Sequence, residues 1–240
     1  MVKANLMLRL TSVTAAIKQL FFPHICAGCA GEHLGKDSQI CPACLQALHP
    51  TQFSRYANNP VEKKFTGRVP VQTATAQFYF SKSSVLQQLV FNFKYAGNMA
   101  LGIQLGRSMG HSLQQSGRFT GIDLLLPVPL APRKLRKRGF NQSAILCKGI
   151  SEITGWPVAE TGVQRLRANT TQTRKDRVER WENVSGIFGV TNRQLLQNKH
   201  VLLVDDVITT GATLEACAQA LLTVNGLKLS IATLCYVPGW

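Results

Sequence analysis

The sequence predicts an α/β fold, with a mostly parallel sheet and helices on both of its faces, preceded by a small cysteine-rich module. Apolar strand-like runs alternate with amphipathic helical segments through the second half of the chain, and this alternation is typical of a parallel sheet covered by helices. Four of the seven cysteines fall in two close pairs near the N-terminus. The 240 residues suffice for one ordinary domain and a small module. We therefore expect three parts, at residues 1–21, 22–57 and 66–240.

The first part, residues 1–21, has the pattern of an amphipathic helix. Leu6, Leu10, Val13, Ile17 and Leu20 recur at helical spacing. We expect this helix to pack on the rest of the protein, because its charge is modest for a membrane-surface helix. No secretory signal is recognisable, and no segment approaches the roughly 20 apolar residues of a membrane span. These features predict a cytoplasmic protein without a membrane span.

The second part, residues 22–57, has the cysteine spacing of a zinc ribbon. Cys26 and Cys29 form one C-x-x-C turn, and Cys41 and Cys44 form a second one after eleven intervening residues. Each such turn presents two thiolates, and two turns complete a tetrahedral, structural Zn²⁺ site. The gap is slightly shorter than usual for such sites, so free or redox-active cysteines are the alternative. A reducing compartment favours metal binding over disulfides.

The third part contains the predicted sheet and its helices. Residues 58–65 are polar and are interpreted as a linker. The expected strands are Val71–Phe80, Ile122–Val128, Val158–Arg165, His200–Val207 and Leu229–Tyr236, and the expected helices are Val85–Tyr95, Met99–Leu113, Ser143–Ile153 and one that carries Leu214, Cys217, Ala218, Leu221 and Leu222 on a single face. The remaining cysteines, Cys147, Cys217 and Cys235, fall on apolar faces and are expected in the core.

The most informative segment lies where the strand His200–Val207 ends. It delivers two adjacent carboxylates, Asp205 and Asp206, and the loop Thr209, Thr210, Gly211, Ala212 and Thr213 then opens a helix. Ligands of parallel sheets bind beyond the carboxyl ends of the strands, and a helix N-terminus offers free N–H donors to a phosphate. The carboxylates can accept hydrogen bonds from sugar hydroxyls or help to place Mg²⁺. A solvated turn with ordinary helix capping is the alternative.

The segment from Val201 to Thr213 resembles the motif of type I phosphoribosyltransferases that binds 5-phosphoribosyl-1-pyrophosphate (PRPP). The resemblance implies the type I phosphoribosyltransferase fold. It implies that Asp205 and Asp206 engage the ribose hydroxyls, with Mg²⁺ accompanying PRPP, and that Thr209 to Thr213 hold the 5′-phosphate. Pro127, Val128, Pro129 and Leu130 match the pyrophosphate loop that follows the first core strand. Residues of the mobile loop that closes over PRPP are matched by Arg167, Thr170, Gln172 and Arg174.

Flanking residues resemble the ComF family. They are Pro127-Val128-Pro129, Arg138-Gly139-Phe140-Asn141-Gln142, the pair Lys94-Tyr95, and the spaced series Arg167, Thr170, Gln172, Arg180, Asn183, Gly186 and Phe188. This resemblance implies a role in DNA uptake during natural transformation or in DNA utilisation, and a DNA-import helicase as a partner. It leaves open whether the chain transfers a phosphoribosyl group to an unknown acceptor, handles DNA, or senses PRPP without catalysis.

The charge of the chain favours polyanionic partners. The formal net charge is +15, and no acidic residue occurs between Glu62 and Asp123. Five cations occupy one run of six positions, namely Arg133, Lys134, Arg136, Lys137 and Arg138. They could neutralise the pyrophosphate of PRPP, form a track for the phosphates of single-stranded DNA, or be a solvated turn. Aromatic residues that could stack on bases are Tyr95, Phe140, Trp156 and Trp181.

Overall fold

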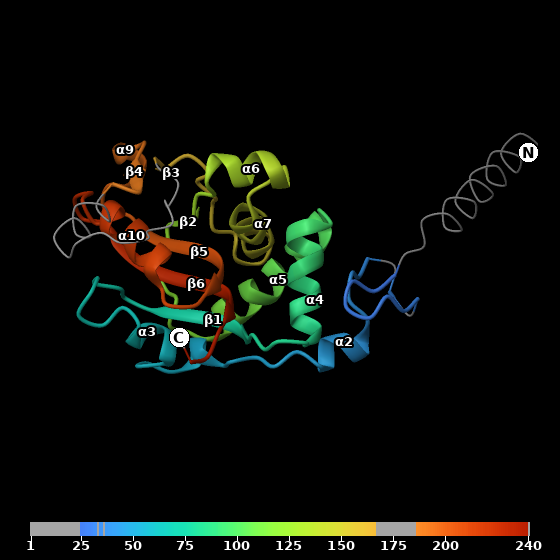
Figure 1. Cartoon of the computed structure of the whole chain (residues 1–240). Helices are drawn as coiled ribbons and strands as arrows, with labels where there is room; N and C mark the ends of the chain where they lie inside the picture. Colours follow the sequence, from blue (N-terminus) through green and yellow to red (C-terminus); the bar gives the residue numbers. More distant parts are fainter. Residues whose placement is uncertain (1–24, 33, 36, 167–185, 240) are drawn as a thin grey trace, which may run out of the picture.

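The protein is built around a four-stranded parallel sheet, as expected from the sequence (Figure 1). The computed structural model describes residues 25–32, 34–35, 37–166 and 186–239. The strand order is β1-β6-β5-β2, and the strands are β1 (Ala74–Tyr79), β2 (Leu124–Pro127), β5 (His200–Ile208) and β6 (Lys228–Tyr236). Every neighbouring pair in this sheet is parallel, so all four strands end at the same edge.

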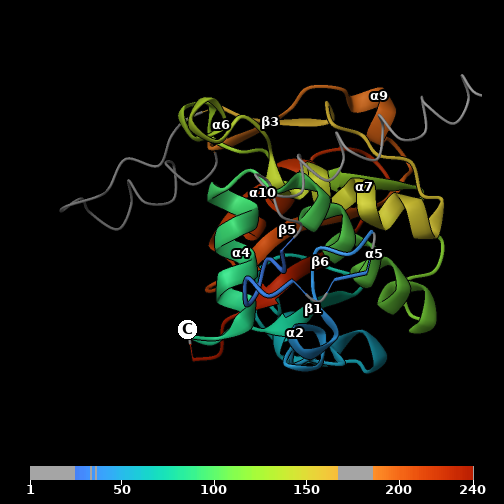
Figure 2. The ribbon, with the colours of Figure 1, turned by 90° about the vertical axis from the view of Figure 1, so that its right-hand side faces the viewer.

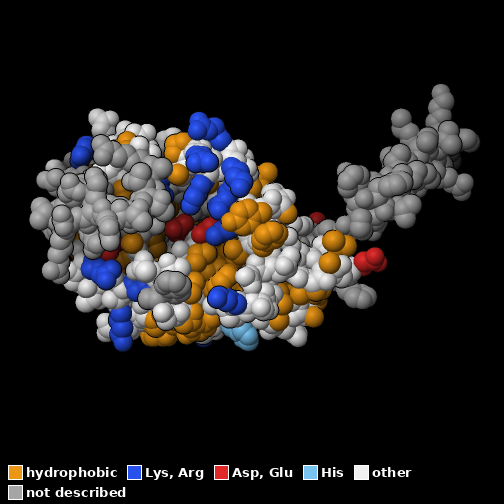
Figure 3. Space-filling model, viewed as in Figure 1, with side chains coloured by type: hydrophobic (Ala, Val, Ile, Leu, Met, Phe, Trp, Pro, Cys, Tyr) orange, Lys and Arg blue, Asp and Glu red, His pale blue; other side chains and the backbone are white. Residues whose placement is uncertain are grey.

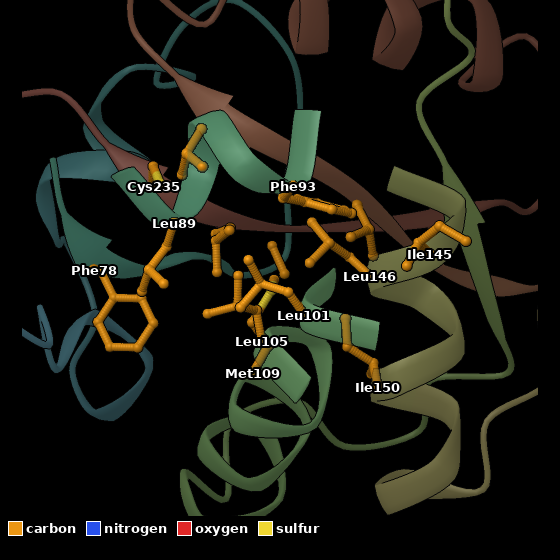
Figure 4. Packing of buried hydrophobic residues seen from close by; sticks show 14 of the residues in the cluster. Phe78, Leu89, Phe93, Leu101, Leu105, Met109, Ile145, Leu146, Ile150 and Cys235 are labelled. Carbon is orange, nitrogen blue, oxygen red and sulfur yellow. The ribbon is translucent and has the colours of Figure 1, made fainter. Parts of the chain in front are cut away.

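One face of the sheet is covered by three helices, α4 (Val85–Tyr95), α5 (Met99–Gln115) and α7 (Gln142–Thr154). Leu202 and Val204 of β5 lie in the same apolar cluster as buried side chains of these helices, including Phe93, Leu105 and Leu146. Figure 4 shows Phe93, Leu146 and their neighbours converging between the helices. Helices α5 and α7 approach closely because Gly106 and Gly149 lie at their contact, where a side chain would meet the backbone of the other helix.

The opposite face is covered by α10 (Ala212–Leu221), the helical turn α3 (Pro60–Lys63) and the short 3-10 helix η1 (Phe53–Arg55). Val201 and Leu203 of β5 belong to this second cluster, together with Phe53, Val61 and Leu214. Alternate residues of β5 therefore enter opposite clusters, as expected for a central strand buried on both faces. A separate two-stranded antiparallel sheet, β3 (Val163–Arg165) with β4 (Phe188–Val190), and the short helix α9 (Arg193–Leu196) lie near one end of the molecule.

The cysteine-rich module is joined to the domain by packing as well as by the chain. It contains the short helix α2 (Pro42–Gln46), and Cys26 and Cys44 belong to the same apolar cluster as α4 and α5. Asn92 of α4 donates from its side-chain amide to the carbonyl of Ala27 at 2.6 Å. The backbone N–H of Gln39 donates to the side chain of Gln104 in α5 at 2.7 Å. Figure 2 shows the module beside α4 and α5.

Three expectations from the sequence were wrong or incomplete. Residues 58–65 are not a linker, because Asn59, Val61 and Phe65 are buried and Asn59 caps α3. The predicted strand Val158–Arg165 is reduced to β3, which lies outside the central sheet, although Val158 forms one isolated parallel bridge to Leu125. The basic run, for which no helix was predicted, forms α6 (Pro132–Arg138).

Two further expectations concern the N-terminal segment and membrane-spanning helices. The predicted helix at residues 1–21 lies outside the described residues. Among the helices of the described part of the chain, none combines the length and the apolar character that crossing a bilayer requires.

Candidate functional site

The two adjacent acids lie at the carboxyl-terminal edge of the central sheet. Asp205 and Asp206 are near the end of β5, whose last residues, Val207 and Ile208, still pair with β6. Because they are adjacent on a strand, their side chains leave it towards opposite faces. Both are partly exposed, whereas Val201 to Val204 before them are fully buried. The buried part of the strand thus ends in two carboxylates that solvent can reach.

Asp205 is held by two donors. Its Oδ1 accepts a hydrogen bond from the hydroxyl of Ser143, at the start of α7, at 3.0 Å and one from the backbone N–H of Asp206 at 2.9 Å. Burial and the neighbouring charge of Asp206 raise the pKa of Asp205 to about 7, against the lowering effect of its hydrogen bonds and of Lys94. The charge of Asp205 also acts on Arg165 of β3, whose pKa burial lowers. Asp205 therefore keeps its proton to a higher pH than an ordinary aspartate does.

Asp206 forms an ion pair with Lys94, the penultimate residue of α4. The distance from Lys94 Nζ to Asp206 Oδ2 is 2.8 Å, and the two side chains are 15% and 16% exposed. Lys94 is among the residues that resemble the ComF family, but it was not predicted to lie in the site. No local pattern could reveal this contact, because it joins the end of a helix to a strand that is distant in sequence.

The predicted phosphate turn is open to solvent. Thr209, Thr210, Ala212 and Thr213 are exposed and, with Asp205 and Gly211, line a small pocket. Gly211 caps α10 with φ of 85°, a left-handed conformation that favours glycine. The backbone N–H of Ala212 donates to Thr210 Oγ1 at 3.3 Å. The N-terminus of a ten-residue helix therefore faces the pocket.

Residues 58–65, which were predicted to be a linker, lie beside this turn. A side chain at Gly211 would lie 3.5 Å from the ring of Phe65 and 3.8 Å from Cβ of Lys64. The ammonium group of Lys64 lies 5.5 Å from the ring centroid of Tyr236, and burial lowers the pKa of Lys64. Lys64 was not predicted as a site residue, because the polar residues around it indicated a solvent-exposed linker.

The predicted pyrophosphate loop follows β2, the neighbour of β5 in the sheet. Pro127 and Val128 are buried, and Pro129 and Leu130 are partly exposed. The backbone N–H of Val128 donates to the carbonyl of Val204, one residue before Asp205, at 2.9 Å. Together with residues of α6, α7 and β3, this loop lines a pocket that reaches Arg165. The structure therefore brings the loop and the acid pair to the same edge of the sheet.

The basic run forms α6, in which no residue is buried. Figure 3 shows Lys and Arg side chains gathered over this helix, next to acidic side chains. Arg138 donates to the side chain of Gln142 at 2.8 Å. The Nε2 group of Gln142 is buried and, within the described residues, makes no hydrogen bond.

Of the four aromatic residues considered for base stacking, Tyr95 is exposed. Phe140 and Trp156 pack against the core, and the ring of Phe140 lies 5.9 Å from that of Phe93. Trp181 lies outside the described residues, as do Arg167, Thr170, Gln172 and Arg174 of the predicted mobile loop. Their assignment stays a prediction.

The four cysteines converge as the spacing predicted. The sulfur atoms of Cys26, Cys29, Cys41 and Cys44 all lie within 4.8 Å of one another. Tetrahedral Zn–S bonds of about 2.3 Å require sulfur separations of about 3.8 Å, and Cys29 Sγ lies 3.7 Å from Cys41 Sγ. Gly28 allows the close turn, because a Cβ there would lie 2.8 Å from Cys44 Sγ. This cluster fits one structural metal ion.

Backbone donors favour the thiolate form of Cys26. The N–H groups of Gly28 and Cys41 donate to Cys26 Sγ at 3.4 and 3.2 Å. Burial raises the pKa of Cys26, but hydrogen bonds with Cys41, Cys29 and Gly28 outweigh it and lower this pKa to about 6. The three other cysteines, Cys147, Cys217 and Cys235, are fully buried, as expected.

Part of the chain matches a known domain family. Residues 149–239, which include the acid pair and the phosphate turn, match the phosphoribosyl transferase domain family. The chain thus contains a type I phosphoribosyltransferase-type domain, with a four-cysteine module before it. Among solved structures, glutamine PRPP amidotransferase from Bacillus subtilis is 22% identical, with a TM-score of 0.38 over 54% of this chain and 25% of that chain, which is too distant to support an inference.

Proteins named for DNA utilization and competence are similar to this chain, two of them along most of its length. The DNA utilization protein YhgH of Escherichia coli K12 is 28% identical over 215 residues, which cover 88% of this chain and 89% of that protein. Competence protein F of Haemophilus influenzae is 24% identical over 84% of this chain and 92% of its own. Competence protein ComFC of Bacillus subtilis is 32% identical over 99 residues, covering 41% of this chain and 38% of that protein. Along most of its length the chain is therefore similar to proteins named for DNA utilization and for competence.

Proposed function

We propose that this chain binds PRPP, or a related ribose 5-phosphate, at the acid pair and the turn that follows it. The observation that carries the proposal is the position of Asp205 and Asp206 at the end of the buried strand β5, directly before the open turn at the N-terminus of α10. The turn and the start of α10 would supply backbone N–H groups and threonine hydroxyls for a 5′-phosphate. The carboxylates accept hydrogen bonds from the ribose hydroxyls.

Neighbouring side chains and the loop after β2 would orient the two carboxylates and bind the pyrophosphate of PRPP. Ser143 and Lys94 hold the two carboxylates in place. The loop Pro127 to Leu130 lies where a pyrophosphate would meet the same edge of the sheet. Asn141 donates to the carbonyl of Val128 in this loop, and the neighbouring Gln142 has a buried Nε2 group that makes no hydrogen bond among the described residues. Mg²⁺, whose preferred ligands are carboxylate and phosphate oxygens, would add positive charge at the pyrophosphate when PRPP is bound.

Titration calorimetry of the full chain with PRPP and with ribose 5-phosphate tests this proposal. Asp205→Asn and Asp206→Asn should each weaken binding about 10- to 100-fold, because each removes a hydrogen bond to a charged acceptor. Glu215→Gln is the matched control, since Glu215 lies in the first turn of α10 but pairs with Arg68 at 3.2 Å. Binding that survives both aspartate substitutions, or no heat with either ligand, contradicts the proposal.

We also propose that α6 binds single-stranded DNA, in line with the DNA-related names of the relatives. Five cations on a helix without buried residues can neutralise backbone phosphates. Replacing Arg136 and Lys137 with Gln should weaken binding to all sequences alike and make it less dependent on salt. An unchanged affinity and salt slope in an oligonucleotide titration would rule out this surface.

A transfer reaction is the alternative for the same site. In that case an unidentified acceptor displaces pyrophosphate from C1 of the ribose, and the protein acts by positioning the reactants and stabilising the leaving group. Pyrophosphate release from PRPP and candidate acceptors would show transfer, and tight binding without release would show a sensor. We propose a cytoplasmic location, because metal-binding cysteines require reduced thiols, and a DNA-import helicase as partner.

A further inference from the structure

Helix α4 leaves an aromatic pair exposed to solvent. Phe91 and Tyr95 are 54% and 60% exposed, and their ring centroids lie 5.2 Å apart with an angle of 44° between the rings. They are four residues apart and so share one face of the helix. Phe93, between them in sequence, is fully buried. The sheet and the helices around it thus bury one aromatic residue of this helix and leave two outside.

The exposed pair borders the basic helix. The guanidinium carbon of Arg138, at the end of α6, lies 5.2 Å from the centroid of the Tyr95 ring. The hydrogen bond from Arg138 to Gln142 fixes the direction of this side chain. In Figure 3, hydrophobic side chains lie beside the Lys and Arg group and the acidic side chains.

The pair also adjoins the proposed ribose site. Lys94, which precedes Tyr95, reaches Asp206 at 2.8 Å. On the other side, Phe91 lines an open groove with residues of the first cysteine turn, including Ala27 and Cys29. A chain-like ligand could therefore run from α6 across the two rings without leaving the surface of the protein.

The chemistry of this face favours a polyanion that carries flat rings. Neither α4 nor α6 contains an acidic residue, and α6, which contacts Tyr95 through Arg138, carries five cations. A nucleic-acid strand satisfies both features, because its bases stack on aromatic rings and its phosphates pair with cations. A hydrophobic protein partner would use the rings but leave the cations of α6 without a counter-charge.

We propose that Phe91 and Tyr95 form a base-stacking subsite for a single-stranded nucleic acid whose phosphates lie along α6. This inference rests on the proposed DNA binding and goes beyond it, because it names the residues that contact the bases. It makes binding depend on the presence of bases, which a purely electrostatic surface does not.

Fluorescence anisotropy of the full chain with two labelled probes tests the inference. One probe is an oligothymidine of about 20 nucleotides, and the other is an abasic strand of the same length and charge. The wild-type protein should bind the oligothymidine at least about 10-fold more tightly than the abasic strand, since stacking adds affinity at each base. Phe91→Leu/Tyr95→Leu should abolish this preference and leave the affinity for the abasic strand unchanged.

Two control variants separate stacking from other effects. Arg136→Gln/Lys137→Gln should weaken both probes by the same factor, because those side chains contact phosphates in this scheme. Leu45→Ala removes an exposed apolar side chain in α2 and should change neither affinity. Circular dichroism and the affinity for PRPP of the Phe91/Tyr95 variant should match those of the wild type.

The outcomes distinguish this inference from the proposals on which it rests. Equal binding of the two probes by the wild type overturns the stacking subsite but not DNA binding. In that case the exposed pair Phe91 and Tyr95 would be a contact for a protein partner. Failure of both probes to bind overturns the inference together with the proposed DNA binding. Neither result bears on the binding of PRPP, which calorimetry measures separately.

Discussion

Replacing Lys94 with Met removes the cation that faces the acid pair, and the structure predicts a large cost. At a separation of 2.8 Å, unit charges interact by about 6 kcal/mol at an effective dielectric constant of about 20. Desolvation of the pair offsets part of this energy, and a broken, largely buried pair typically costs about 3 to 5 kcal/mol. Because both side chains keep some solvent contact, we expect a loss of about 2 to 3 kcal/mol in the free energy of unfolding at pH 8.

The loss should depend on pH. The charge of Lys94 lowers the pKa of Asp205, which burial and Asp206 raise to about 7. Without Lys94 this pKa rises further, so Asp205 takes up a proton more readily. At pH 5.5 Asp205 is protonated with or without Lys94, and Asp206 then faces no neighbouring negative charge. The cost of Lys94→Met should therefore be smaller at pH 5.5 than at pH 8.

Urea denaturation followed by circular dichroism measures both values. Lys148→Met is the matched control, because its pair with Glu160 is 3.9 Å long and more than half exposed, and such pairs contribute less than about 1 kcal/mol. In a double-mutant cycle, Lys94→Met/Asp206→Asn should recover most of the lost stability. Equal costs for the two lysine variants, or additive effects in the cycle, would refute a coupled pair at this site.

Three further predictions test the acid pair, the helix packing and the cysteine cluster. Because the pKa of Asp205 is raised from 3.8 to about 7, the folded state binds this proton more tightly than the unfolded state, and stability falls as pH rises through this range. Asp205→Asn should remove this pH dependence and be more stable than the wild type at pH 8 by on the order of 2 kcal/mol in urea titrations. An unchanged pH profile would contradict the raised pKa. Gly149→Ala, whose Cβ would lie 2.9 Å from Cα of Gly106, should cost about 3 kcal/mol, whereas Gly35→Ala, with no atom within 4 Å, should cost little in the same measurement. Cys44→Ser should abolish stoichiometric zinc in elemental analysis and lower the melting temperature by about 10 °C, while Cys217→Ala should keep its zinc; a Cys44→Ser protein with full zinc content would exclude the cysteine cluster.

Local sequence patterns were sufficient where a single segment decides the structure. The apolar run before Asp205 predicted β5 because a strand buried on both faces needs apolar residues at every position. The helix after Gly211 followed from one apolar stripe. The two C-x-x-C turns predicted a four-sulfur cluster because each turn already fixes the separation of its own thiolates.

Local patterns failed where packing outweighed composition. The polar residues 58–65 resembled a linker, yet Asn59 is buried because its side chain bonds carbonyls of Phe53, Tyr56 and Ala74 and so replaces its hydration. Residues 158–165 were expected to form a short strand of the sheet, but β3 pairs with β4 instead of extending the central sheet.

The sequence by itself determined the strand–acid–turn–helix unit and the cysteine cluster, because their parts are neighbours along the chain. Only the tertiary structure decided that Lys94 faces Asp206, that Lys64 borders the phosphate turn, and that Tyr95 is exposed beside Arg138 while Phe140 is packed inward. These contacts join elements that are distant in sequence, and they depend on how the helices are oriented on the sheet. That orientation is a property of the whole packed core, which no single segment encodes.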